Sequence, residues 1–568
     1  MKTRSSLLFL SFLFLLISCN NEKQETSNRI IGSTGDSAMV VSAHPIATKI
    51  GLDILRKGGN TIDAAVATQF ALAVVYPRAG NIGGGGFAVI RLSDGGTNTL
   101  DFREKAPSKS SRDMFLDEDG NVIPDLSTLG HLAAGVPGSV AGMWELHKKM
   151  GSLQWPDLIA PAVKVAKEGF HITQHEADAL NEKQDNFKAA NTHTPWVIKE
   201  GKWAKGDLVI QPELAATLGL IQDLGRDGFY TGEVAQSIVQ EMKSGNGIIS
   251  LEDLKNYQPV WRAPIIGSYK SHKIISMPPP SSGGIALIQL LHGAEQLDIT
   301  AHPHNSKMAV HLMAEVEKRV FADRAKHLGD PDFYDVPAAF ITSSNYLTNR
   351  YKDIRLNKFT PSSEIYAGVV LAKESFETTH FSIVDHKGNA VAITTTLNLN
   401  YGCKVWVKGA GFVLNNEMDD FSAKPGVPNS FGLIGADANA IKPNKRMISS
   451  MTPTIIEKDG KLKMILGTPG GSTIITSVFQ TAINVIDYGM NIQEAVNAKK
   501  IHHQWLPDQI KIEDGALDSL TISSLKAMGH KFEIVNSIGK NDCILIHKDG
   551  TIEGGADYTR GDDYAEGF

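Results

Sequence analysis

The chain is poor in cysteine and has no block of basic residues, and each shortage excludes a class of protein. Its 568 residues include three cysteines, Cys19, Cys403 and Cys543, and none stands in the C-x-x-C spacing of zinc and redox sites. A disulfide scaffold and a cysteine-ligated metal centre are therefore excluded. The net charge is −6 without a basic cluster, so we expect no nucleic-acid partner.

Signals for cofactors and metals are equally scarce. The glycine-rich run 467–472 lacks the lysine and the spacing of a phosphate loop. His502-His503 has no partner at metal-ligand spacing and is interpreted as structural. We therefore predict no nucleotide, no other cofactor and no metal.

The first residues have the pattern of an export signal. Lys2 and Arg4 precede the apolar run Leu7–Ile17, whose 11 residues are too few to span a bilayer, which takes about 20. The run fits the core of a signal peptide instead. Leu16-Ile17-Ser18-Cys19 resembles a bacterial lipobox, in which the cysteine is lipidated and becomes the first residue of the mature chain. An ordinary signal peptide with an incidental cysteine is the alternative.

The lipobox interpretation predicts an exported lipoprotein. Residues 1–18 are then the signal peptide, Cys19 carries the lipid, and residues 19–29 form a polar, flexible tether. Two or more acyl chains on Cys19 anchor a protein stably, whereas one chain binds only marginally. No aspartate follows Cys19, which by resemblance to lipoprotein sorting rules favours a periplasmic lipoprotein anchored to the bacterial outer membrane.

The rest of the chain alternates pairs of strands with pairs of helices, without regular βαβ units, which is typical of an α+β fold. The stretch 135–350 is predicted to be mostly helical. Apolar periodicity predicts helices at 47–57, 61–75 and 473–488, and hairpins that pair 87–92 with 99–103, 378–384 with 390–398, and 453–456 with 462–466.

Thr378 is the strongest candidate for a nucleophile. The hydroxyl of an internal threonine has no base beside it, whereas a threonine at a chain terminus carries its own base, the α-amino group, with a pKa of about 7.7–8.0. The irregular segment 357–377 just upstream is a natural place for a cut. Whether the chain is cut between Glu377 and Thr378 therefore decides whether it is an enzyme.

The hairpin that begins at Thr378 brings other polar groups to it. If the turn is centred on Lys387 or just after it, Thr378 faces Thr396 or Leu397 on the second strand. The amide of Asn398 is delivered to the same end. Threonine runs also suit ordinary strands, and the hairpin alone favours that plainer interpretation.

Two glycines open the predicted helix at 473. Gly470 and Gly471 offer unhindered N–H groups at a helix N-terminus, which suits a developing oxyanion. A tight turn between a strand and a helix is an equally good interpretation.

Charged and hydroxyl side chains gather at two further places. The run Asn415–Phe421 is rich in acids and amides and suits a cationic group such as the ammonium of an amino acid. Arg103 with Ser449-Ser450 suits a carboxylate, because a guanidinium binds carboxylates with two parallel hydrogen bonds. Taken singly, each is more often a set of solvated side chains on the protein surface.

Together these residues resemble the bacterial γ-glutamyltransferases (γ-glutamyl transpeptidases, glutathione hydrolases), which are N-terminal nucleophile hydrolases. The resemblance covers about residues 30–568. The motifs that carry it follow one another along the chain at 58–65 (GGNTIDAA), 83–87 (GGGGF), 101–104 (DFRE), 136–139 (VPGS), 378–380 (TTH), 415–422 (NNEMDDFS), 425–429 (PGVPN), 449–451 (SSM) and 469–472 (PGGS).

The resemblance implies a four-layer αββα sandwich, one domain built from two autoproteolytic fragments, 30–377 and 378–568. It also implies a role for each candidate. The catalytic residues are Thr378, which is the nucleophile for self-cleavage at Glu377–Thr378 and for turnover, Thr396 beside it, and Gly470 and Gly471 as the oxyanion hole. The substrate-binding residues are Arg103, Ser449 and Ser450 for the α-carboxylate of the glutamyl group, and Asn398, Glu417 and Asp420 for its α-ammonium.

The implied activity is the cleavage of glutathione and other γ-glutamyl amides through a γ-glutamyl-threonine ester, which passes to water or to an amino acid or peptide amine. Two alternatives stay open. The first is a cephalosporin or glutaryl acylase of the same fold, whose substrates lack the α-ammonium and would leave Asp420 and Glu417 unused. The second is a non-catalytic lipoprotein that binds γ-glutamyl compounds and stays uncut.

Overall fold

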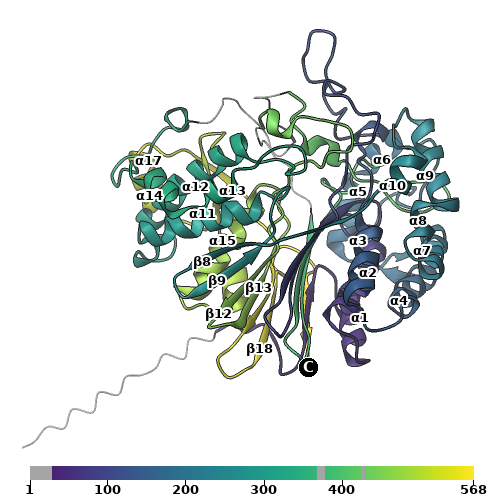
Figure 1. Cartoon of the computed structure of the whole chain (residues 1–568), viewed down its shortest axis with the longest axis horizontal. Helices are drawn as coiled ribbons and strands as arrows, with labels where there is room; N and C mark the ends of the chain where they lie inside the picture. The colour runs from purple at the N-terminus through teal and green to yellow at the C-terminus, as the bar shows by residue number, and fades with distance from the viewer. Residues whose placement is uncertain (1–28, 367–377, 425–426, 428, 431–432, 434) are drawn as a thin grey trace, which may run out of the picture. The chain divides into compact units, whose positions relative to one another are not determined.

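The computed structural model describes residues 29–366, 378–424, 427, 429–430, 433 and 435–568 (Figure 1). The chain divides into two units, Met1–Ile30 and Ile31–Phe568, and every element named below belongs to the second. The predicted signal peptide, Cys19 and Glu377 lie outside the described residues. In the part of the chain that is described, no helix combines the length and the apolar character needed to cross a membrane.

Two seven-stranded sheets form the centre of the second unit, and every strand pair within them is antiparallel. The first sheet runs in the order β1 (Ser33–Gly35), β18 (Ile552–Ala556), β17 (Asp542–Ile546), β13 (Lys461–Leu466), β12 (Thr454–Lys458), β9 (His272–Ser276) and β8 (Ile265–Tyr269). The second runs in the order β19 (Tyr564–Gly567), β2 (Met39–Ser42), β10 (Thr379–Val384), β11 (Ala390–Thr396), β3 (Gly85–Arg91), β4 (Thr97–Asp101) and β7 (Val260–Arg262). Smaller sheets join β14 (Ile501–His502), β15 (Ile510–Glu513) and β16 (Phe532–Val535), and β5 (Phe170–His171) with β6 (Leu208–Val209).

Helices cover the outer face of each sheet, and the two inner faces pack on each other through β10 with β17, β11 with β13 and β2 with β18. The helices on the side of the second sheet are α1 (Pro45–Arg56), α2 (Thr61–Val75), α3 (Ser139–Met150), α4 (Trp155–Glu168), α5 (Gln174–Glu182), α6 (Gln184–Ala190), α7 (Pro212–Leu224), α8 (Asp227–Tyr230), α9 (Gly232–Ser244) and α10 (Leu251–Asn256) (Figure 1). Those on the side of the first are α11 (Gly283–Gln296), α12 (Lys307–His327), α13 (Ala338–Ile341), α14 (Ser344–Tyr351), α15 (Thr473–Ile486), α16 (Ile492–Asn497) and α17 (Ser519–Ala527). The predicted α+β fold with αββα layers is confirmed.

The predicted helices and hairpins are present, with ends within two residues of those expected from the sequence. One prediction was incomplete, because the stretch 135–350 contains, besides the two-residue strands β5 and β6, the strands β7, β8 and β9 among its helices. The last three strands are three to five residues long, and β8 lies at the edge of its sheet with alternating half-buried and exposed residues. Such short segments carry too little periodicity to be separated from their helical surroundings. Cys403 and Cys543 are both buried and free, so they do not pair.

Both sheets combine strands that precede Thr378 in the sequence with strands that follow it. In the second sheet, β10, β11 and β19 follow Thr378 in sequence, whereas β2, β3, β4 and β7 precede it. In the first sheet, four strands that follow Thr378 lie between β1 and β9, which precede it. A chain cut before Thr378 would therefore keep both parts joined by sheet hydrogen bonds and by a common core.

Candidate active site

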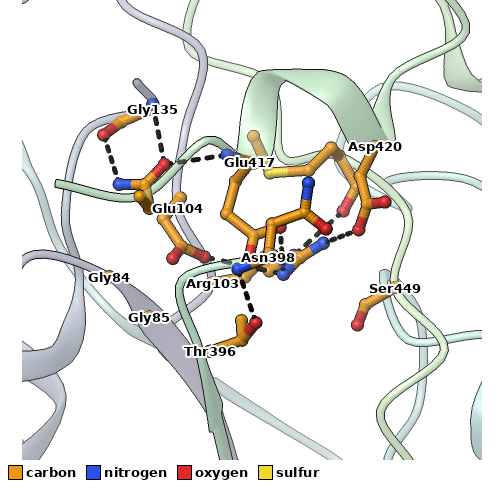
Figure 2. Close-up of polar contacts among 12 residues, drawn as sticks. Gly84, Gly85, Arg103, Glu104, Gly135, Thr396, Asn398, Glu417, Asp420 and Ser449 are labelled. Carbon is orange, nitrogen blue, oxygen red and sulfur yellow. Dashed lines mark hydrogen bonds and ion pairs between the residues drawn. The ribbon is translucent and has the colours of Figure 1, made fainter. Parts of the chain in front are cut away.

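Thr378 lies directly before β10, a strand that is buried along its whole length between β2 and β11. The pairing of Thr379 with Thr395 selects the first of the two predicted registers, so Thr378 faces Thr396 rather than Leu397. Their hydroxyl oxygens are 3.4 Å apart. The Thr396 oxygen also accepts a hydrogen bond of 2.7 Å from the backbone N–H of Asn398 (Figure 2). The side chain of Thr378 is thus held on a rigid strand with a second hydroxyl beside it.

His380 lies two residues after Thr378, but it is not available as a base. Its Nδ1 is 2.9 Å from the Thr394 hydroxyl and its Nε2 is 3.1 Å from the Ser382 hydroxyl. Burial lowers the pKa of His380 to about 3, so the ring is neutral at physiological pH. A base for Thr378 must therefore come from elsewhere, and a free α-amino group on Thr378 itself would supply one.

A pocket of about 270 Å³ opens at Thr378. Eight of the ten predicted catalytic and binding residues line it, together with Leu433, Met451 and Ile474. The eight are Arg103, Thr378, Thr396, Asn398, Asp420, Ser449, Ser450 and Gly471. Gly470 and Glu417 are not in the lining, although Gly470 adjoins Gly471 and Glu417 contacts Arg103.

Arg103 is the electrostatic centre of the pocket (Figure 2). It is 1 % exposed, and its guanidinium makes ion pairs of 2.7 Å with Glu417 and 2.5 Å with Asp420. Glu104 lies 3.7 Å away on the other side. Burial acts to lower the pKa of Arg103, but the three carboxyls outweigh it and hold the pKa above its ordinary value. The predicted carboxylate-binding and ammonium-binding groups are therefore in direct contact with one another.

Three carboxyls surround Arg103, whereas the sequence analysis gave a binding role to only two of them, Glu417 and Asp420. Glu104 appeared there only as part of the motif 101–104. Burial raises the pKa of Glu417 and of Asp420, and raises that of Glu104 to about 8, while Arg103 acts in the opposite direction on all three. One guanidinium does not balance three buried negative charges, so this group retains a proton at neutral pH. A ligand ammonium in the pocket would favour full ionisation of the acids.

Ser449 and Ser450 present hydroxyl protons to the pocket. The Ser449 oxygen accepts a hydrogen bond of 3.2 Å from the N–H of Met451, and the Ser450 oxygen accepts one of 3.1 Å from Arg324. Neither hydroxyl donates to another of the described residues. A hydroxyl has a single proton, so both serines are arranged to donate to a ligand, as binding of a carboxylate requires.

Gly470 and Gly471 form the turn into α15, with φ values of 137° and 54° that favour glycine. Their carbonyls accept hydrogen bonds from the backbone N–H groups of Thr473 (3.0 Å) and Ile474 (3.3 Å). Within the described ranges, neither glycine N–H donates to another residue. Gly471 lines the pocket together with Thr378, as the predicted oxyanion hole requires.

One cluster of possible metal ligands lies outside the pocket. The ligand atoms of His311, Glu315 and His530 are within 4.8 Å of one another and buried. The two imidazoles are hydrogen-bonded to each other at 2.8 Å, and Glu315 is paired with Lys318 (2.5 Å) and Arg319 (2.9 Å). Two cations already neutralise this carboxylate, so the cluster is a structural network rather than a promising metal site.

Comparison with known proteins shows which family the whole chain resembles. The family model described as gamma-glutamyltranspeptidase matches residues 47–567. The chain is 46 % identical to the glutathione hydrolase proenzyme of Escherichia coli (strain K12), over 93 % of this chain and 92 % of that protein. The crystal structure of Helicobacter pylori gamma-glutamyltranspeptidase is similar with a TM-score of 0.56 and 47 % identity, over 58 % of this chain and 94 % of that one. Cephalosporin acylase from Bacillus halodurans gives a TM-score of 0.81 at 25 % identity, over 97 % and 99 % of the two chains.

Proposed function

The chain belongs to the gamma-glutamyltranspeptidase family, and we propose that it cuts itself before Thr378 and then transfers γ-glutamyl groups through that residue. Glutathione and related γ-glutamyl amides are the donors, and water or an amino acid or peptide amine is the acceptor. The observation that carries this proposal is that Thr378, the Arg103 ion-pair group and two proton-donating serines lie in one pocket of about 270 Å³.

Self-cleavage converts Thr378 into a nucleophile with its own base. The Thr378 hydroxyl attacks the carbonyl carbon of Glu377, and the acyl group moves from nitrogen to oxygen. Water then hydrolyses the ester and leaves a carboxylate on Glu377 and a free amine on Thr378. Since both nitrogens of His380 are engaged by hydroxyls, this amine is the base that takes the proton from the Thr378 hydroxyl in each later turnover.

Turnover places the glutamyl head between two sets of charged and polar groups. Arg103, Ser449 and Ser450 hold the α-carboxylate; Asn398, Glu417 and Asp420 hold the α-ammonium. The γ-carbonyl then meets Thr378, whose hydroxyl attacks it, and the N–H groups of Gly470 and Gly471 stabilise the oxyanion. The amine leaves with a proton from the Thr378 α-amino group, and an acceptor attacks the γ-glutamyl ester.

The two fragments, 30–377 and 378–568, remain one domain after the cut. We expect this because strands from both fragments pair with one another in both sheets. Size-exclusion chromatography without denaturant would thus give one species and a denaturing gel two bands.

Three anilide donors test the choice between a γ-glutamyl enzyme and an acylase. The γ-glutamyl group carries both charges, the glutaryl group lacks the ammonium, and the 4-aminobutyryl group lacks the carboxylate. We expect kcat/KM to be at least about 100-fold higher for γ-glutamyl 4-nitroanilide than for either analogue, because each analogue leaves buried polar groups without a partner. Preference for the glutaryl anilide would favour the acylase, and an uncut, inactive chain would favour the binding lipoprotein.

The lipid anchor is a separate part of the proposal and rests on the lipobox-like residues 16–19. We propose that Cys19 is lipidated and holds the enzyme at the periplasmic side of the envelope, on the outer membrane. Cys19→Ser is expected to move activity from the membrane fraction to the soluble fraction after export. Asn20→Asp, which keeps the cysteine, should stay membrane-bound but move to the inner membrane. Equal fractionation of all three chains would contradict the anchor.

A further inference from the structure

A second buried guanidinium lies behind the serines of the pocket. Arg324, in the last turn of α12, is 3 % exposed. Its Nε donates to the Ser282 hydroxyl at 2.9 Å, and its Nη2 donates to the Ser450 hydroxyl at 3.1 Å. Ser282 donates in turn to the carbonyl of Ser449 at 2.7 Å. One side chain thus fixes both members of the serine pair, Ser450 through its hydroxyl and Ser449 through its peptide.

Arg324 differs from the other buried arginines nearby in its partners. Arg103 pairs with Glu417 at 2.7 Å, and Arg319, on the same helix as Arg324, pairs with Glu315 at 2.9 Å. Among the described residues, no carboxylate oxygen lies within 4.0 Å of the Arg324 guanidinium, and its hydrogen bonds go only to the hydroxyls of Ser282 and Ser450. A buried cation without a carboxylate partner is unfavourable unless a ligand supplies the negative charge.

The charge of Arg324 persists at neutral pH. Burial lowers its pKa to about 10, and Arg103 acts in the same direction, while Asp420 raises it. The Ser450 hydroxyl, which lines the pocket at Thr378, is therefore bonded to a fixed cation.

We propose that Arg324 is a positioning residue that sets the hydroxyl of Ser450 and the peptide of Ser449 for the α-carboxylate of the donor. Because the Ser450 oxygen accepts from Arg324, its only proton is directed away from the guanidinium and into the pocket. The cation also polarises this hydroxyl, which strengthens the bond that it donates to an anion. The inference rests on the proposed γ-glutamyl function and adds a residue that lies outside the lining of the pocket at Thr378 and acts through the serines.

Arg324→Gln and Arg324→Lys test the proposal with the three anilide donors. In Arg324→Gln, we expect KM to rise about 10- to 100-fold for the two donors that carry the carboxylate, γ-glutamyl and glutaryl, with kcat changed less than about threefold. For the 4-aminobutyryl donor, kcat/KM should change less than about threefold. Arg324→Lys keeps the charge but replaces two rigidly spaced donor nitrogens with a single ammonium, so its KM values should fall between those of the wild type and Arg324→Gln.

Arg91→Lys is the matched control. Arg91 is also buried, at 5 % exposure, and pairs with Glu457 at 2.9 Å outside the lining of the pocket. Its substitution should leave the ratios among the three donors unchanged. Equal losses on all three donors in Arg324→Gln would overturn the proposal, and so would a failure of both Arg324 variants to cut themselves, since the proposal gives Arg324 no part in maturation. Lack of γ-glutamyl activity in the wild type would instead refute the proposed function.

Discussion

Thr378→Ala is expected to remain a single chain of about 60 kDa on a denaturing gel and to lose γ-glutamyl activity by at least about 10⁴-fold. The mature wild-type chain, counted from Cys19, should give fragments of about 39 kDa and about 21 kDa, scaled from 61.5 kDa for the whole chain. Removal of the hydroxyl abolishes both reactions at once, because the same atom attacks the Glu377 carbonyl and the donor. Loss of a covalent nucleophile costs most of the acceleration of such an enzyme.

Thr379→Ser is the control for this experiment. Thr379 is also buried, but it lies one residue further along β10, so its side chain points to the opposite face of the sheet. This variant should cut itself and turn over donors close to the wild-type rate. A cut Thr378→Ala chain, or an uncut but active wild type, would show that Thr378 is not the nucleophile.

The part of the site that lies on one hairpin could be predicted from the sequence. Thr378, Thr396 and Asn398 lie at one end of a hairpin whose strands are joined by a short turn, so the position of that turn left two registers to consider. The helix-opening glycines at 470 and 471 were equally visible, because glycine before an apolar-periodic helix is a local signal.

The rest of the site depends on contacts between distant segments. Arg103 and Asp420 are 317 residues apart in the sequence and meet at 2.5 Å only through the folded sheets. No spacing rule links such positions, and the resemblance to a family was needed to group them. Arg324 had no signal at all, since an arginine in the last turn of a helix is ordinarily a favourable surface charge.

The placement of Thr378, the proposed nucleophile, would explain why one fold serves both self-cleavage and turnover. Thr378 begins a central strand whose neighbours β2 and β11 come from the two sides of the cut. We expect the new terminus to stay in register after the bond breaks, because β10 pairs with β11 from Thr379 onward and with β2 from Phe381 onward. Groups held this rigidly lose little entropy in reaching the geometry of attack.

Asp420→Asn is expected to be the second most damaging change, and its effect should depend on the donor. One Asp420 oxygen pairs with Arg103 at 2.5 Å and the other accepts from Asn429 at 3.1 Å, in a pocket where Asp420 is proposed to hold the α-ammonium. Loss of one partner from a buried, hydrogen-bonded charge pair costs about 3–5 kcal/mol, or about 10²- to 10⁴-fold. We expect kcat/KM to fall by that factor for the γ-glutamyl and 4-aminobutyryl anilides.

The glutaryl anilide has no ammonium, so its kcat/KM should fall less than about tenfold in Asp420→Asn. The ratio of kcat/KM for the γ-glutamyl anilide to that for the glutaryl anilide should therefore decrease. Asp419→Asn is the control at the adjacent position. The Asp419 carboxylate accepts from the Ser127 hydroxyl at 2.6 Å and from the N–H of Ser430 at 3.0 Å, and it does not line the pocket. Its substitution should change kcat/KM for all three donors by the same small factor. If Asp420→Asn reduced kcat/KM equally for the three donors, the role of Asp420 would be to maintain the structure of the pocket and not to bind the ammonium.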